Sequence, residues 1–529
     1  MKRNILEADE TAVNEKYHTG KLLGRLIAVS DLSDEQTASL LSCDSTLHTS
    51  SCECVRRCCD RIIQARNNHE KVFVGGDYDA DGISATAIMK RTLDVLGIQN
   101  GYYIPDRFKE GYGLSPATVS MVKEKGYSLI ITVDNGVKAH EALAKARELG
   151  LEVIVTDHHR IEEDIDADIV VHPDYMEPEY EYLCGAGVAL EISRNLIGNR
   201  DELTAIAAVA SIGDVMPLWK ETRRIVLAGM EILRRRIPRS LDAMLRPGTP
   251  VSWTSIAFQI VPKLNSVGRM NDISNVNTLV PYLLSTDERV ISTYAVQLDH
   301  VNEVRRELSE AQTKTAEKMV DDSDILLLYN ESFHEGICGL IAGRIANSLQ
   351  KPVLVFAKSG SLIKGSGRSV SGFDMFSFFS DFDEPCAFGG HEQAVGISVN
   401  AEDFERFCAH VKTKFAAENY TYEEPSLTAV SVKADEITMD EIMALSRAEP
   451  VPKELISNFA LTDPVVLSVK ETPKVTRYTL ACASGPLEAV LFKRKGIVPP
   501  EEPSCMIGKL TLNRWRSNVT MTLEIEDIF

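Results

Sequence analysis

The chain has 529 residues, of which 44% are hydrophobic and 25% are charged. This composition is ordinary for a globular protein, and the length predicts about two to four domains. Acidic residues outnumber basic ones by 77 to 57, and the net charge of −20 argues against a protein that coats nucleic acid by bulk electrostatic attraction. A nucleic-acid substrate would need a local basic groove.

The sequence also argues against secretion and membrane insertion. The start, MKRNILEADETAV, has no long apolar run behind its basic residues, and later apolar stretches are short and interrupted by charge. Eleven cysteines without regular spacing are typical of reduced thiols rather than of a disulfide framework. These features predict a cytoplasmic protein.

Strand and helix patterns alternate from Lys71 onward, after a stretch over residues 1–50 with mixed polar and helical signals. Short β-branched runs such as KVFVGG, SLIITV and EVIVT are separated by helical patterns, which predicts a parallel sheet covered by helices. Residues 175–320 are typical of helices, and the charged pattern from Ser292 to about Val320 predicts a connector.

A second α/β unit extends from ILLLYN to the helical pattern DFERFCAHVKTKF, with a Gly/Ser-rich turn at KGSGRS. Residues 418–450 are acidic and irregular, and alternating strands from about Ala460 predict a small antiparallel barrel. These patterns divide the chain into an N-terminal helical extension at 1–66, a first α/β domain at 67–290, a connecting helix at 291–320, a second α/β domain at 321–418, a linker at 419–458 and a barrel at 459–529.

Acidic and imidazole side chains directly follow the predicted strands. An open parallel sheet binds ligands beyond the carboxyl ends of its strands, so these positions are candidates for chemistry. Three strands are followed by DYDADG, DNG and DHH, and the apolar helix AIAAVASI ends at GD. The candidate residues are Asp77, Asp79, Asp81, Asp134, Asp157, His158, His159 and Asp214.

Carboxylates that converge on one sheet edge repel one another unless a cation neutralises them. Oxygen ligands with imidazole suit Mn²⁺ or Mg²⁺, and two such ions about 3.5–4 Å apart polarise a phosphoryl group and a bound water together. The pattern therefore predicts phosphoester hydrolysis. A Ca²⁺ loop is excluded because its twelfth position, counted from Asp77, is Ile88 rather than Glu. Helix caps and a buried histidine pair are the structural alternatives.

These residues resemble a known family. DYDADG at 77–82, DNG at 134–136, DHH at 157–159 and GD at 213–214 resemble the ordered motifs of the DHH phosphoesterase superfamily. GGH at 389–391 resembles the signature of its DHH-associated C-terminal domain. The chain is similar to the RecJ single-stranded-DNA-specific exonucleases through the further segments IPDRFKEGYGL, PKLNSVGRM, SFHEGICGLIAGRIA, KGSGRSVSGFD and LTLNRWRSN.

The resemblance implies an α/β fold in which a DHH parallel-sheet domain and a DHH-associated α/β domain are joined by a long helix, with a C-terminal OB-fold β-barrel. It implies processive 5′→3′ hydrolysis of single-stranded DNA to 5′-mononucleotides in DNA repair and recombination, with two Mn²⁺ or Mg²⁺ ions. The expected partners are single-stranded DNA and, as candidates, a helicase or a single-strand-binding protein, and the expected state is a monomer. The metal ligands implied by position are Asp77, Asp79, Asp81, Asp134, His158 and Asp214.

Two further roles follow from the resemblance. Asp134 matches the carboxylate that bridges the two ions, and it is therefore a catalytic residue as well as a ligand. His159 matches the second histidine, which is suited to contact the scissile phosphate or to stabilise its developing charge. Asp157 is suited to orient a neighbouring histidine.

The substrate-binding candidates combine small residues with cations. A small-residue loop with a guanidinium can bring backbone N–H groups against a phosphate, although a flexible turn has the same composition. For Arg269 a helix-end ion pair is the alternative. The candidates are Arg269, Gly365, Ser366, Gly367, Arg368, Gly390 and His391.

Other cations are weaker candidates. Arg305 and Arg306 have glutamates beside them, so a solvated charged face is as good an interpretation as a DNA contact. His334, Arg344 and Lys364 are further cleft candidates. In the barrel, Arg514, Trp515 and Arg516 offer a stacking ring between cations, with barrel core as the alternative for the tryptophan.

The cysteines Cys52, Cys54, Cys58 and Cys59 raise the possibility of a zinc site. Their spacing is not a usual finger pattern, and the segment is typical of a helix, on which adjacent cysteines point to different faces. A reduced cluster is the preferred interpretation.

Three alternative functions stay open. A DHH enzyme that cleaves short oligoribonucleotides or cyclic dinucleotides would not depend on the barrel. A non-catalytic DNA-replication scaffold of the same ancestry would have lost metal ligands, whereas every matched position is intact here. An inorganic pyrophosphatase shares the metal ligands but has no GGH motif.

Overall fold

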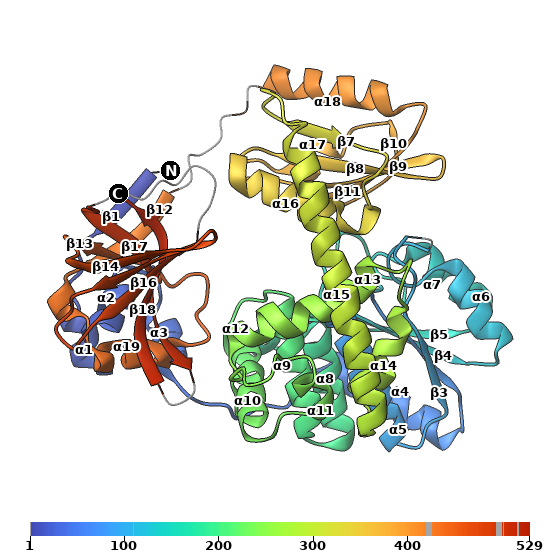
Figure 1. The fold of residues 1–529 in the computed structure, drawn as a ribbon. Helices are drawn as coiled ribbons and strands as arrows, with labels where there is room; N and C mark the ends of the chain where they lie inside the picture. Colours follow the sequence, from blue (N-terminus) through green and yellow to red (C-terminus); the bar gives the residue numbers. More distant parts are fainter. Residues whose placement is uncertain are drawn as a thin grey trace.

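The structure is a computed structural model that describes residues 2–108, 110–418, 420, 426–492, 500, 502–515 and 518–529. It contains two α/β domains connected by one long helix and a β-rich domain that lies beside the helices of the first (Figure 1). This arrangement confirms the predicted fold class. None of the helices in the described ranges is both long and apolar enough to cross a membrane.

The first domain is built on a five-stranded parallel sheet of order β3-β2-β4-β5-β6. Its central strands are apolar on both faces, as expected for a sheet covered by helices on both sides. The strands are β2 (Val72–Gly75), β3 (Asn100–Tyr103), β4 (Leu129–Val133), β5 (Glu152–Thr156) and β6 (Ile169–Val171).

Two hydrophobic cores hold the helices to this sheet. Helices α6 (Pro116–Glu124) and α7 (His140–Glu148) share one core with β2, β4 and β5. The other face packs on α4 (Glu53–Asn67), α5 (Ala80–Val95) and α8 (Gly185–Ile197). Further helices extend this side, namely α9 (Asp201–Gly213), α10 (Lys220–Arg236), α11 (Arg239–Asp242), α12 (Trp253–Ser255), α13 (Val261–Arg269) and α14 (Leu279–Leu283).

The 30-residue helix α15 (Glu288–Glu317) connects the two α/β domains (Figure 1). Asp287 caps its start by accepting hydrogen bonds from Arg289 N and Val290 N. The helix packs on α13 in the first domain and on α16 (Cys338–Leu349) in the second. It therefore fixes the distance between the two sheets.

The second domain has a five-stranded mixed sheet of order β10-β11-β9-β8-β7 over a phenylalanine-rich core. Its elements are β7 (Leu326–Tyr329), β8 (Val353–Ser359), β9 (Leu362–Arg368), β10 (Pro385–His391), β11 (Ala394–Asn400), α17 (Met375–Phe379) and α18 (Phe404–Glu418).

The turn predicted at KGSGRS is wrong, because most of this segment is part of strand β9. The glycines are needed to fit the strand against its neighbours. A Cβ atom at Gly365 would come within 2.3 Å of the Phe356 ring, and one at Gly367 within 2.5 Å of Met375 Sδ.

The β-rich domain is an eight-stranded sheet of order β1-β12-β13-β17-β18-β16-β15-β14. Its strands are β1 (Lys2–Leu6), β12 (Ser426–Val432), β13 (Phe459–Thr462), β14 (Val466–Glu471), β15 (Val475–Leu480), β16 (Leu487–Phe492), β17 (Cys505–Trp515) and β18 (Asn518–Ile528). Helices α1 (Thr11–Tyr17), α2 (Lys21–Val29), α3 (Asp34–Leu41) and α19 (Met439–Leu445) belong to the same domain.

Two predicted boundaries need correction here. The predicted linker at 419–458 contains β12, which pairs in parallel with β1 and β13. The predicted N-terminal extension at 1–66 is divided: residues 2–41 join the β-rich domain, and α4 covers the first sheet. Strand β1 is mostly exposed, so its sequence has no pattern of buried residues that predicts a strand. It forms a strand because it pairs with β12, which lies far along the chain.

Helix α10 anchors the β-rich domain to the first domain. Trp219, at its start, is only 4% exposed and lies in the core of the β-rich domain. Arg223 is buried one turn later and donates hydrogen bonds to Pro450 O at 2.8 Å and Leu40 O at 2.9 Å. These contacts set the position of the β-rich domain against the α/β domains.

Candidate metal centre and cleft

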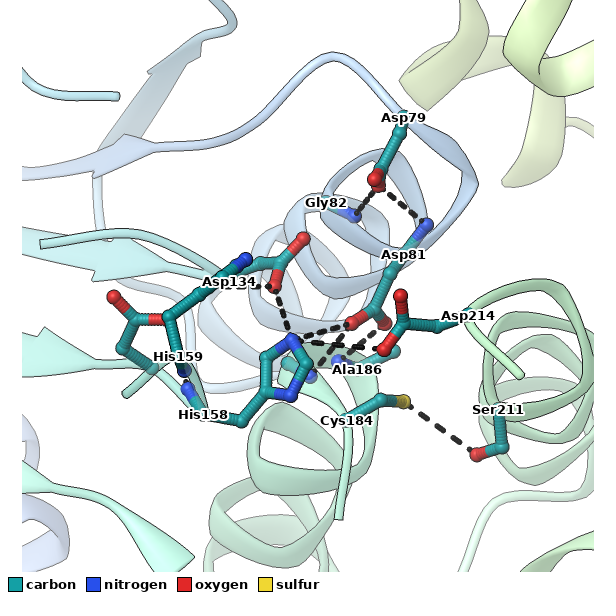
Figure 2. Close-up of polar contacts among 12 residues, drawn as sticks. Asp79, Asp81, Gly82, Asp134, His158, His159, Cys184, Ala186, Ser211 and Asp214 are labelled. Carbon is teal, nitrogen blue, oxygen red and sulfur yellow. Dashed lines mark hydrogen bonds and ion pairs between the residues drawn. The ribbon is translucent and has the colours of Figure 1, made fainter. Parts of the chain in front are cut away.

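The predicted acidic residues gather at the carboxyl ends of β2, β4 and β5 (Figure 2). Asp134 directly follows β4 with a left-handed backbone, at φ 60°. Its carboxylate is almost fully buried, as are those of Asp77 and Asp81. The open parallel sheet therefore brings these charges together at one edge, as its topology predicts.

The start of α5 holds two of the carboxylates in place. Asp79 is the N-cap of the helix and accepts hydrogen bonds from Asp81 N at 2.9 Å and Gly82 N at 3.0 Å. Asp81 accepts from Gly185 N at 2.7 Å and Ala186 N at 2.8 Å, the first residues of α8. Two helix N-termini thus stabilise the negative charge.

His158 lies at the centre of the cluster (Figure 2). Its Nε2 atom is 3.1 Å from Asp134 Oδ1, 3.6 Å from Asp81 Oδ2 and 3.7 Å from Asp214 Oδ2. Asp214 reaches the cluster from the end of α9. Within this cluster, the residues that can surround a single ion form three overlapping groups: Asp134, His158 and His159; Asp81, His158 and Asp214; and Asp77, Asp79 and Asp134.

The carboxylates resist ionisation in the metal-free arrangement. Burial, followed by repulsion from neighbouring carboxylates, raises the pKa of Asp77 and of Asp134 well above the ordinary value. The same two causes raise the pKa of Asp79 and bring that of Asp214 to about 8. Among the described residues, buried Oδ1 of Asp77 and buried Oδ1 of Asp134 accept no hydrogen bond, although His158 Nε2 lies within ion-pair distance of the Asp134 oxygen. Hard divalent cations fit this set, because they satisfy these oxygens and offset the repulsion.

Asp157 orients the second histidine. Its Oδ1 atom lies 2.8 Å from His159 Nδ1, and its Oδ2 atom accepts a hydrogen bond from Val137 N at 3.0 Å. Burial opposes protonation of His159, but the hydrogen bond and charge of Asp157 outweigh burial and raise the pKa to about 9. The imidazole is thus a cation at neutral pH beside the acidic cluster.

A cavity of about 540 Å³ lies between the two α/β domains, next to His159. The second domain contributes several predicted residues to its wall, namely Gly365, Ser366, Gly390 and His391, with Lys364 from the weaker group. Lys364 Nζ crosses the gap and donates to Phe108 O at 2.8 Å. The rings of His159 and His391 face each other with centroids 6.5 Å apart and an angle of 12° between their planes.

Arginines cluster beside the metal centre. The guanidinium of Arg107 lies over the Tyr78 ring at 4.9 Å. Burial, and then repulsion from Arg107 and Arg368, lowers the pKa of Arg269 to about 10. In the part of the chain that the structure describes, no carboxylate forms an ion pair with Arg107, Arg269 or Arg368. Unpaired, partly buried cations next to carboxylates that could hold metal have the chemistry suited to a phosphate.

The structure also supplies residues whose roles the sequence did not reveal. Tyr112 donates to Asp134 O at 2.9 Å, and its hydroxyl is 3.1 Å from His159 Nδ1. Asn135 donates to Gly75 O and accepts from Leu114 N, and so connects two loops at the sheet edge. Arg107 and Tyr112 stand inside IPDRFKEGYGL, which was available as a motif but carried no assigned role.

Several weaker candidates are not part of this cluster. His334 pairs with Asp272, and Arg344 is exposed. Arg306 is exposed and pairs with Glu303. Gly367 faces Met375 rather than the cavity.

The predicted barrel residues fall outside the described part of the chain, and the cysteines are not part of the acidic cluster. The side chains of Arg514 and Trp515, and all of Arg516, lie outside the described residues. No cysteine belongs to any potential metal-binding group among the residues described.

Fold and site together define a phosphoesterase with two α/β domains around the acidic cluster. Residues 71–213 match the DHH family, N-terminal domain, and residues 322–417 match the DHHA1 domain. The single-stranded-DNA-specific exonuclease RecJ of Bacillus subtilis (strain 168) is 31% identical, with 100% of this chain and 70% of the relative covered. The chain belongs to the RecJ family of single-stranded-DNA-specific exonucleases.

Solved structures show the same architecture. RecJ from Thermus thermophilus in complex with Mn²⁺ matches with a TM-score of 0.85 at 23% identity, over 100% of this chain and 79% of that one. A structure of exonuclease RecJ bound to manganese matches with a TM-score of 0.63 at 28% identity, over 71% of this chain and 97% of that one.

Proposed function

We propose that this protein hydrolyses single-stranded DNA from the 5′ end to 5′-mononucleotides and that it requires two Mn²⁺ or Mg²⁺ ions. The observation that carries the proposal is the pairing of two features in one cleft. Buried carboxylates with unsatisfied oxygens lie at the sheet edge, and arginines without acidic partners lie beside them among the described residues. The first feature suits divalent cations, and the second suits a phosphate.

The ion ligands would be Asp77, Asp79, Asp81, Asp134, His158 and Asp214. When bound, two divalent ions supply Lewis-acid polarisation of the phosphoryl oxygens and lower the pKa of a water. The helix N-termini that hold Asp79 and Asp81 fix the carboxylates before substrate arrives. Asp134, which lies within reach of both sides of the cluster, is the bridging carboxylate in this proposal.

The other residues would bind and orient the strand. His159, protonated and held by Asp157, is placed to donate a hydrogen bond to the scissile phosphate as negative charge develops there. Arg107, Arg269 and Arg368 would hold the terminal phosphate, which sets where the first phosphodiester bond lies. The cavity beside His391 has the size of a small-molecule pocket and would receive the terminal nucleotide.

A single entering strand fits the remaining features. The net charge of −20 gives no bulk attraction for duplex DNA, so binding would depend on the local arginines. We further propose that the protein acts as a monomer in the cytoplasm, in repair and recombination. A helicase that exposes single strands and a single-strand-binding protein are the partner classes that suit this substrate.

The test uses single-stranded DNA labelled at either end, with Mn²⁺. Wild-type protein should release the 5′ label at once as a mononucleotide, and a chelator should stop the reaction until Mn²⁺ is restored. Asp134→Asn should abolish hydrolysis while binding of the strand persists. Asp322→Ala, an exposed aspartate in the second domain, is the matched control and should behave as wild type.

Other results would favour the alternatives. If neither label is released while the strand still binds, the protein is a scaffold rather than a nuclease. Preference for short oligoribonucleotides over long DNA would indicate the oligoribonuclease alternative.

A further inference from the structure

Two cysteines touch at the start of helix α4, on the side of the first domain where the N-terminal segment joins it. The Sγ atoms of Cys52 and Cys54 are 2.9 Å apart. All eleven cysteines lie in described parts of the chain and are free thiols, and among them this is the one recorded sulfur–sulfur contact. A disulfide bond is about 2.05 Å long, so the two sulfurs need to approach by less than about 1 Å.

The helix start distinguishes the two thiols. Cys52 is the N-cap of α4, and its sulfur accepts a hydrogen bond from Val55 N at 3.5 Å. A helix N-terminus with a backbone N–H directed at sulfur is an environment in which a thiolate is reactive. Burial, and then the contact with Cys52, raises the pKa of Cys54 to about 12. We therefore assign the role of nucleophile to Cys52, because the backbone N–H of Val55 is directed at its sulfur.

The backbone before the pair is held firmly. Glu177 accepts hydrogen bonds from Ser50 Oγ at 2.6 Å and Ser51 N at 2.9 Å. Glu191 accepts from Ser50 N at 2.5 Å. These hydrogen bonds hold the backbone that leads into α4. The two sulfurs therefore lie side by side in the folded protein, and no rare conformational change is needed to bring them together.

We propose that Cys52 and Cys54 form a reversible disulfide when the protein meets hydrogen peroxide. The site is both partly exposed and separate from the metal centre. Cys58, on the same helix, is buried and takes no part. The reduced thiols predicted for this cluster thereby gain a role as a two-thiol oxidation site.

The chemistry is balanced with peroxide as the only oxidant. The Cys52 thiolate attacks one peroxide oxygen, an S–O bond forms, the O–O bond breaks, and the released hydroxide takes up a proton to leave as water. The Cys54 sulfur then attacks Cys52 sulfur, the S–S bond forms and the S–O bond breaks. The second oxygen leaves as water with the Cys54 thiol proton and the hydroxyl hydrogen. Two thiols and one peroxide give one disulfide and two waters.

The test treats the full-length protein with hydrogen peroxide, blocks the remaining thiols by alkylation and maps the tryptic peptides by mass spectrometry. Residues 26–56 form one tryptic peptide that contains Cys43, Cys52 and Cys54. We expect this peptide to lose two alkylation sites and two hydrogen atoms, and to regain both sites after a dithiol reductant. Peptides with the exposed Cys386 should lose none under the same treatment.

Variants locate the bond. Cys43→Ser should keep the loss of two sites, whereas Cys52→Ser and Cys54→Ser should each abolish it, with folding checked by circular dichroism. Persistence of both alkylation sites in oxidised wild-type protein would overturn the proposal. So would a bond that survives in the Cys54→Ser variant. If a serine variant fails to fold, fragmentation of the wild-type peptide decides the matter, because the remaining alkyl group should be on Cys43.

Discussion

Replacing Arg269 by glutamine should make the protein more stable and less active. The guanidinium is partly buried, and burial together with Arg107 and Arg368 lowers its pKa from the ordinary value to about 10. At about 1.4 kcal/mol per pKa unit, this corresponds to about 3 kcal/mol. Because water screens part of the side chain, we expect about 1–2 kcal/mol. At neutral pH the arginine is charged in both the folded and the unfolded protein, so the folded state is destabilised by this full amount. The glutamine variant has no charge to bury, and its free energy of unfolding should be higher by the same amount.

The same substitution should weaken the reaction. Hydrogen bonds between charged groups contribute about 1.5–3 kcal/mol each, so the loss of one phosphate contact should reduce kcat/KM by about 10–150-fold. Urea unfolding of metal-free protein measures the first effect, and initial rates on 5′-phosphorylated single-stranded DNA measure the second. Arg306→Gln, at an exposed position paired with Glu303, is the control and should change neither quantity.

Two outcomes would refute the reasoning. If Arg269→Gln unfolds at lower urea than wild type, the arginine makes stabilising contacts and is not strained. If kcat/KM is unchanged, the arginine does not contact the substrate. Added phosphate gives a further check, because it should stabilise the wild type more than the variant.

Asp157→Asn should remove a pH dependence of stability. Protonated His159, with its pKa of about 9, stabilises the metal-free fold fully below pH 6.5, and this contribution of about 3 kcal/mol is lost as the pH rises from 6.5 through 9. Urea unfolding at pH 6 and 9.5 should show the loss in wild type but not in the variant. Gly390→Ala should lower kcat/KM, because the new Cβ would lie 2.2 Å from Ala394 O and the residue has φ 147°, whereas Gly389→Ala has open space and should be tolerated. Trp219→Ala should cost about 3–5 kcal/mol and release the β-rich domain, seen as an earlier unfolding transition by circular dichroism.

The metal-binding edge could be predicted because sequence and topology agree there. Each of β2, β4 and β5 is a short, fully or nearly fully buried run, so the residues that follow must lie at one sheet edge. The order of the motifs then indicates the candidate ligands. The side chains that contact the acidic residues inside the site could not be predicted in the same way. Tyr112 and Arg107 lie in a loop, and their position depends on contacts with Asp134 and Tyr78 that form only in the folded chain.

Strand β9 and strand β12 show why composition was insufficient elsewhere. In β9 the glycines signal a turn, yet they are present because Phe356 and Met375 leave no room for a side chain. In β12 the buried residues Ala429, Val430 and Val432 sit within an acidic, irregular stretch, so the strand was interpreted as linker. Both strands take their conformation from neighbours far along the chain.

The pairing of β1 with β12 has a consequence for the order of folding during synthesis. Lys2 pairs with Ser426, so strand β1 is synthesised long before its partner strand β12. Leu22 and Leu23 of α2, fully buried in the finished protein, must stay exposed during that time. The two α/β domains can complete their own cores first, since domains generally fold as units during translation. During synthesis the apolar face of α2 therefore stays without its final packing partners until β12 and the strands that follow it have been made.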